Sequence, residues 1–302
     1  TTSEVSLIRT LLNTSYLSRL LVDFYSSHAT HALREAIELT LNRSYILLLS
    51  IPIALGALLL NLTADAQNSI DVIVRLGLLV SLPLFWGVLY TAVASARDPM
   101  TTVGEGMNSA VHRTPTYLLS YLLYKILVWV PVLILVLSTL PLSSFLEPKT
   151  EITLSADTLF RFGSVAPVPE VVTVSPFIVA PLSLAVAIGA FVAFFSHFYD
   201  LEALQYGASP PASIRNSYAS IRQNIHMTIG YFVVRLSLKS ISSSALVLVP
   251  LVEILGVADG VHPVFLTIIF VIALTVNISL SAILGTYHVI FYEDLKNAAY
   301  RS

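Results

Sequence analysis

The chain contains no cysteine among its 302 residues, and only 11% of its residues are charged. The absence of cysteine excludes disulfides, cysteine-ligated iron–sulfur clusters and thiolate catalysis. The net charge of −2 provides no basic surface, so we expect no nucleic-acid partner. The sequence also has no phosphate-binding glycine loop, no His-Glu-x-x-His motif and no paired catalytic carboxylates within an apolar segment. We therefore predict a protein that is not an enzyme and that uses no metal or cofactor.

Apolar residues dominate the composition of the chain. They make up 56% of the chain, and the mean hydropathy is +0.81. They gather in six runs, and about 20 helical residues suffice to cross a bilayer core of about 30 Å. Because lipid offers no hydrogen-bond partners to the backbone, such runs should be helices. We predict an all-α integral membrane protein with six transmembrane helices, at residues 45–62, 70–94, 117–140, 176–198, 227–255 and 263–292.

A polar stretch with helical patterning precedes every second apolar run. Aligned without gaps, the three stretches share an apolar third residue and end on Arg43, Arg113 and Asn224. A pattern that recurs in this way predicts one structural unit used several times. We expect three hairpin repeats, each made of an interfacial amphipathic helix followed by two spans. The polar stretches are 31–43, 101–113 and 212–224.

These repeats divide the chain into an N-terminal segment and three units. Apolar residues at helical spacing predict a cytoplasmic amphipathic helix within residues 1–29, which either lies on the membrane and bundle or binds a partner. The second unit holds the longest outer loop, 141–175, where two strand-like segments predict a small β-hairpin. The predicted units are 30–97, 98–201 and 202–302, and the last includes a cytoplasmic tail.

The charge of the predicted loops orients the chain. With six spans, ten arginines and lysines fall on one side, and only Lys149 and Arg161 fall on the other. Basic residues concentrate on the cytoplasmic side of membrane proteins, so we predict a multi-pass protein of the cell membrane with both termini in the cytoplasm. Asn61, in the triplet Asn61-Leu62-Thr63 of an outer loop, is a candidate for glycosylation.

Three basic residues, Lys125, Arg235 and Lys239, lie inside predicted spans. Ionisable residues are costly there and usually face a bundle interior or a cavity. They either line a site for an anionic headgroup or solute, or extend their charged ends to the inner membrane surface. Basic residues of the polar stretches are predicted to engage phosphates of the inner leaflet. These are Arg43, Arg113 and Arg222.

Two further groups of polar residues lie at span ends. His197 and Asp200 are three residues apart, a spacing that places them on one helical face. They could bind a metal ion, but a hydrated helix end is the more common arrangement. Tyr287, His288 and Tyr292 close the last span, where aromatic and polar residues are typical of the membrane interface.

The segment 202–209 resembles the coupling loop of ABC importer permeases. Glu202-Ala203 and the later Gly207 carry this resemblance, although the glycine comes one residue earlier than in that loop. The resemblance implies that Glu202 and Gly207 couple the chain to a cytoplasmic ATPase.

The alternation of polar helices and apolar hairpins resembles a group of poorly characterised prokaryotic membrane proteins. This group includes the membrane domain attached to some glycerophosphodiesterases, the YciC-like proteins and archaeal relatives. The segments 32–43, 102–113, 213–224 and 292–295 carry the resemblance. It implies a helical membrane domain without catalytic residues.

These observations predict a non-enzymatic polytopic membrane module that organises a membrane complex or handles a lipid or anionic solute. Membrane lipids are its expected partners, and other membrane subunits or a cytoplasmic ATPase are further candidates. The alternative is a permease subunit of an ATP-driven transporter, coupled through residues 202–209.

Overall fold

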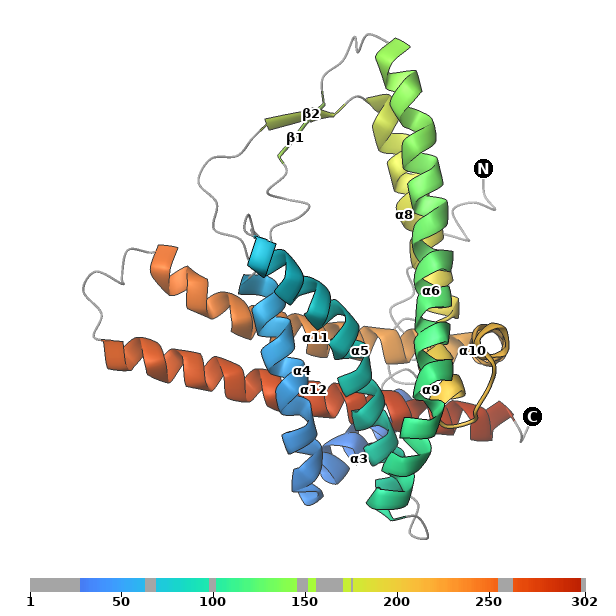
Figure 1. Ribbon diagram of the computed structural model, residues 1–302, viewed down its shortest axis with the longest axis vertical. Coiled ribbons are helices and arrows are strands. Elements are labelled where there is room, and N and C mark those ends of the chain that lie inside the picture. Colours follow the sequence, from blue (N-terminus) through green and yellow to red (C-terminus); the bar gives the residue numbers. More distant parts are fainter. Residues whose placement is uncertain are drawn as a thin grey trace, which may run out of the picture.

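The computed structural model describes residues 28–62, 69–97, 102–145, 152–155, 171–174, 176–254 and 263–299. The predicted N-terminal helix lies outside these residues, apart from the start of α3, and so does most of the loop 141–175. The described elements (Figure 1) are α3 (His28–Asn42), α4 (Ser44–Leu62), α5 (Ser69–Arg97), α6 (Val103–Phe145), β1 (Ile152–Ser155), β2 (Val171–Val174), α8 (Pro176–Phe195), α9 (Tyr199–Leu204), α10 (Pro210–Gln223), α11 (Ile225–Ile254) and α12 (Pro263–Ala299).

Four helical segments are long and apolar enough to cross a membrane: Val72–Arg97, Val111–Leu135, Ser183–Leu204 and Thr267–Ala298. The α3–α4 pair, bent by 99°, would add a fifth if it forms one broken span. The prediction of a helical protein with membrane-spanning segments is therefore confirmed. The count of six stays a prediction, because α11 covers the fifth predicted span as a helix but is not among these candidates.

The long helices associate in three pairs. α4 packs on α5, α6 on α8, and α11 on α12. In Figure 1 these pairs diverge from a common base, with α6 and α8 rising upright and α11 and α12 running across the view. The base contains α3, α9 and α10, and α12 contacts α3, α4, α5 and α11. The pairs coincide with the predicted hairpins, and their equivalence as repeats stays a prediction.

The polar stretches differ in structure. The first and third form separate helices, α3 and α10, whereas the second continues into its span as one helix, α6, of 43 residues. α3 turns away from α4 because its small side chains Ala29, Ala32, Ala36 and Thr40 are buried and allow close packing on α12. The side chains described between 104 and 112 of α6 are exposed, so no packing surface bends this stretch away from the helix axis.

The start of α6 is fixed by a local capping arrangement. The backbone N–H and the hydroxyl of Thr102 each donate to Glu105 Oε2 at 2.9 Å, and the Glu105 N–H donates back to the Thr102 hydroxyl at 3.3 Å. This reciprocal pattern satisfies N–H groups that a helix start leaves without partners. The hydrogen bonds from Thr102 hold the pKa of Glu105 below its ordinary value.

β1 and β2 pair antiparallel, with Ile152 opposite Val174. The prediction of strands in this loop is thus confirmed. Its position outside the cell remains a prediction.

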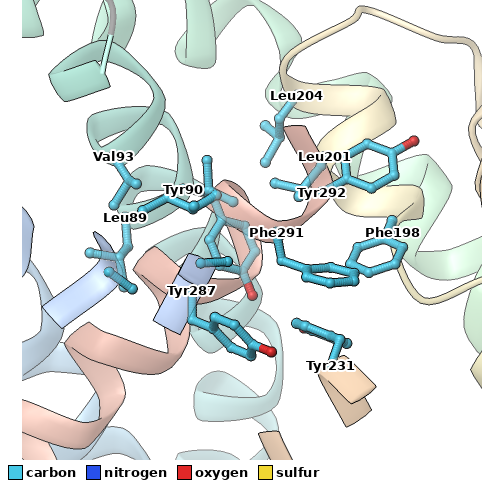
Figure 2. Close-up of a cluster of buried hydrophobic side chains, with 14 of the residues drawn as sticks. Leu89, Tyr90, Val93, Phe198, Leu201, Leu204, Tyr231, Tyr287, Phe291 and Tyr292 are labelled. Carbon is cyan, nitrogen blue, oxygen red and sulfur yellow. The ribbon is translucent and has the colours of Figure 1, made fainter. Parts of the chain in front are cut away.

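The core lies where α12 passes through the base. Figure 2 shows Phe198, Tyr231, Tyr287, Phe291 and Tyr292 gathered there, and the Tyr231 ring stacks on that of Phe291 with centroids 4.6 Å apart. Tyr287, Phe291 and Tyr292 are 0% exposed. The prediction that the end of this span forms an interfacial belt is therefore wrong. The surrounding helices α3, α9 and α10 cover these residues, which the apolar run alone could not indicate.

Candidate functional site

A cavity of about 570 Å³ lies between the three helix pairs near their base. Ligand pockets commonly have volumes of about 300–1,000 Å³. α4 and α5 contribute an almost wholly apolar wall: Ile53, Ala57, Leu60, Leu79, Leu82, Pro83, Trp86 and Tyr90. α6, α9, α11 and α12 contribute a mainly polar wall: Tyr117, Tyr121, Tyr199, Asp200, Arg235, Lys239, Ser242, Asn277, Ser281 and Leu284.

A buried polar centre underlies the polar wall. Arg235 on α11 donates to the hydroxyl of Tyr231, one helical turn earlier, and lies 3.1 Å from His288 Nδ1 on α12. The Tyr231 hydroxyl is 2.6 Å from the same nitrogen. On the other side of the imidazole, Nε2 is 3.1 Å from both carboxylate oxygens of Asp200. His288 therefore bridges the cation of α11 and the carboxylate of α9.

The hydrogen-bond network fixes the protonation of His288. A guanidinium has only donors, so Nδ1 must offer its lone pair to Arg235. Nε2 then carries the proton and donates it to Asp200, which also accepts from the backbone N–H of Leu201 at 2.9 Å. His288 is 1% exposed and neutral in this arrangement.

His197 and Asp200 do not meet as a pair. His197 Nε2 lies 3.2 Å from the Tyr231 hydroxyl, whereas Asp200 bonds His288. The spacing argument presupposed a continuous helix, but a turn at 196–198 separates α8 from α9. The expected hydrated helix end is also wrong, because Asp200 is 8% exposed.

Glu202 forms a second buried charge cluster. Its carboxylate accepts from the Tyr292 hydroxyl, pairs with the Lys296 ammonium and accepts from Asn216 Nδ2 at 3.1 Å. These partners lie on α12 and α10, so Glu202, 1% exposed, ties α9 to both helices. Gly207, in the exposed part of the loop, adopts the left-handed conformation with φ 64°.

One group in the described part of the chain has the geometry to hold a metal ion. The candidate ligand atoms of His31, Glu35 and Asp294 all lie within 4.8 Å of one another. The guanidinium of Arg97 lies 2.9 Å from Glu35 and 3.9 Å from Asp294, and it also pairs with Glu293. Because Arg97 already supplies positive charge to these carboxylates, we interpret the group as an ion-pair network between α3, α5 and α12.

The structure brings together two of the three predicted span cations. Arg235 and Lys239 line the cavity, and Lys125 is not among the lining residues. The Lys125 ammonium instead lies 5.2 Å from the ring centroid of Tyr121 and 5.7 Å from that of Tyr124, within cation–π range.

The other predicted residues lie apart from the cavity. Arg43 and Arg222 are exposed at the ends of α3 and α10. Arg113 donates to the carbonyl oxygen of Leu204 at 2.7 Å and to that of Gln205, at the C-terminal end of α9. The side chain of Asn61 lies outside the described part.

Sequence reasoning missed Tyr231, and it assigned Asp200 and His288 to two separate groups at span ends. A signal for this site exists in the spacing of polar residues along two apolar helices. On α11 they recur at Tyr231, Arg235, Lys239 and Ser242, and on α12 at Asn277, Ser281 and His288. Steps of three, four or seven residues keep side chains on one helical face, and polar stripes on membrane helices usually face a cavity.

No protein-family model, curated protein or solved structure matches the chain.

Proposed function

We propose that this chain is a non-enzymatic membrane module that binds the negatively charged head of an amphipathic molecule in the cavity. One observation carries the proposal. Among the described residues, neither Arg235 nor Lys239 forms a direct ion pair with a carboxylate, yet both line the same cavity. A cation at membrane depth is costly unless a negative charge compensates it, and a bound anionic head would provide that charge.

The opposite wall supports an amphipathic ligand over a small inorganic ion. The lining side chains of α4 are apolar, and so are those of α5 except Tyr90. An alkyl chain placed there would gain about 25 cal/mol for each Å² of apolar surface removed from water. In the proposed orientation, Arg43 and Arg222 would contact phosphates of the inner leaflet.

Three small probes test the proposal on the protein in a neutral maltoside detergent, with bound ligand counted by native mass spectrometry. Methyl decyl phosphate carries one negative charge and a tail, decanol has only the tail, and dimethyl phosphate has only the charge. We expect methyl decyl phosphate to bind best, and Lys239→Met to weaken it about tenfold. Arg215→Met, which removes an exposed cation on α10, is the matched control and should change nothing.

The outcomes separate the possible ligands. Equal binding of decanol and methyl decyl phosphate would refute an anion site. Dimethyl phosphate binding as tightly as methyl decyl phosphate would indicate a soluble anion in place of a lipid. An anionic membrane lipid that co-purifies with the wild type and is lost in Lys239→Met would identify the inner leaflet as the source.

The transporter alternative rests on a different surface. Tyr206, Gly207 and Ser209 are exposed between α9 and α10, where a cytoplasmic ATPase could contact them, although the Glu202 carboxylate is buried. Mass spectrometry of the protein purified from its own membrane tests this alternative. A stoichiometric ATPase, released by Tyr206→Ala, would favour the transporter, whereas a different stable subunit would favour a role in organising a membrane complex. The resemblance to the glycerophosphodiesterase-associated group remains a proposal.

A further inference from the structure

We infer that the cavity prefers a ligand head with one negative charge to a head with two, and that Asp200 sets this preference. The inference rests on the proposed function, because it concerns the charge of the ligand that the cavity binds. It follows from the charges that line the cavity and from the way the single carboxylate among them is held.

Two cations and one carboxylate line the cavity among the described residues: Arg235, Lys239 and Asp200. The nearest imidazole, His288, is neutral because Arg235 faces its Nδ1 at 3.1 Å. The other polar lining groups are hydroxyls and an amide, which carry no charge at neutral pH. The lining therefore has one positive charge in excess.

Asp200 cannot leave the site when a ligand arrives. Both of its oxygens lie 3.1 Å from His288 Nε2, and Oδ1 accepts from the Leu201 backbone at 2.9 Å. The residue is 8% exposed, so these protein groups are its main partners. An incoming anion thus meets a fixed negative charge as well as the two cations that line the cavity.

A head with one negative charge neutralises the excess. A head with two negative charges leaves one without a partner in a site of low dielectric constant, where such a charge is expensive. The cost of desolvating an ion rises with the square of its charge, whereas the attraction to one excess positive charge rises only linearly. The geometry therefore favours the singly charged head.

The test compares two probes that differ by one methyl ester. Methyl decyl phosphate carries one negative charge, and decyl phosphate carries two at pH 9. Both are titrated into the full chain in neutral detergent, and the ratio of their dissociation constants is recorded. In the wild type we expect the singly charged probe to bind more tightly.

Asp200→Asn is expected to move this ratio about thirtyfold toward decyl phosphate. This is the effect of one unit charge at about 8 Å in a medium of effective dielectric constant about 20. Glu202→Gln is the matched control, because it also removes a buried carboxylate from α9. Glu202 bonds Lys296 and Tyr292 and does not line the cavity, so the ratio should stay within about twofold of the wild-type value.

Lys239→Met keeps the inference testable if Asp200→Asn fails to fold. Lys239 is exposed and outside the buried network, and its loss should move the ratio the other way, toward methyl decyl phosphate. A ratio unchanged in Asp200→Asn, or in Lys239→Met if only that variant folds, would overturn the inference while leaving an anion site intact. If the wild type binds neither phosphate better than decanol, the proposed function itself fails.

Discussion

The hydroxyl of Tyr231 joins the groups of the polar centre, and its removal tests whether these contacts stabilise the fold. The hydroxyl lies 2.6 Å from His288 Nδ1 and 3.2 Å from His197 Nε2, and it accepts from Arg235. Tyr231→Phe keeps the buried ring and its stacking on Phe291. It leaves the His197 nitrogen and one guanidinium N–H without this partner.

The expected loss follows from the number of groups left without a partner. A buried polar group without its hydrogen bond costs about 1–3 kcal/mol, and a charged group costs more. One imidazole nitrogen and one guanidinium N–H together give a loss of about 3 kcal/mol in the free energy of unfolding. For a chain of this length, each kcal/mol corresponds to about 2 °C. The apparent melting temperature in detergent, followed by tryptophan fluorescence, should therefore fall by about 6 °C.

Tyr287→Phe is the matched control. Tyr287 is as deeply buried as Tyr231, and the centroids of the two rings are 5.0 Å apart. Its hydroxyl, however, has no hydrogen-bond partner among the described residues. Because removing an unsatisfied buried hydroxyl is neutral or favourable, the melting temperature should stay the same or rise. Equal losses in both variants would refute the reasoning, since the effect would then not depend on the hydrogen bonds of the Tyr231 hydroxyl.

Two further predictions concern helix packing and the choice among the span cations. A side chain at Gly285 of α12 would place its Cβ 2.5 Å from Cδ2 of buried Leu89, so Gly285→Ala should destabilise the protein by about 1–3 kcal/mol. Gly77→Ala, where nothing lies within 4 Å, should instead stabilise α5 by up to about 1 kcal/mol, and thermal melting of both variants checks the contrast. Lys125→Met should leave the affinity for methyl decyl phosphate within about twofold of wild type, unlike Lys239→Met, and equal losses would restore the three-cation site that the sequence suggested.

The sequence predicts individual helices well because the relevant information is local. Apolar runs of about 20 residues leave the backbone few alternatives in lipid, and the predicted spans are helical wherever the structure describes them, except for the turn at 196–198. The start of α6 is likewise encoded locally, in the threonine and glutamate of its capping arrangement. The bend between α3 and α4 is not local. It depends on small side chains such as Ala32 and Ala36 meeting α12, far along the chain.

The polar centre escaped prediction for the same reason. Asp200 and His288 are 88 residues apart, and Tyr231 and His288 are 57 apart. Helical spacing shows which residues share a face, but it does not show which helix that face contacts. Arg235 and Lys239 were identified because a cation in an apolar run is unusual wherever it lies. Asp200 and His288 lie at span ends, where polar residues are common. Their residue types therefore gave no reason to expect burial.

The electrostatics of the base explain why so many charges are tolerated near the ends of apolar helices. Glu202 has Lys296 and Arg97 has Glu293, so each of these charges meets an opposite charge directly. Asp200 and Arg235 differ from these pairs, because a neutral imidazole stands between them. Neither charge is fully neutralised, so each still contributes to the electrostatic potential in the cavity that both residues line. A pair held apart in this way is stabilised less than a direct ion pair, and the charge of a bound head would supply the missing compensation at Arg235.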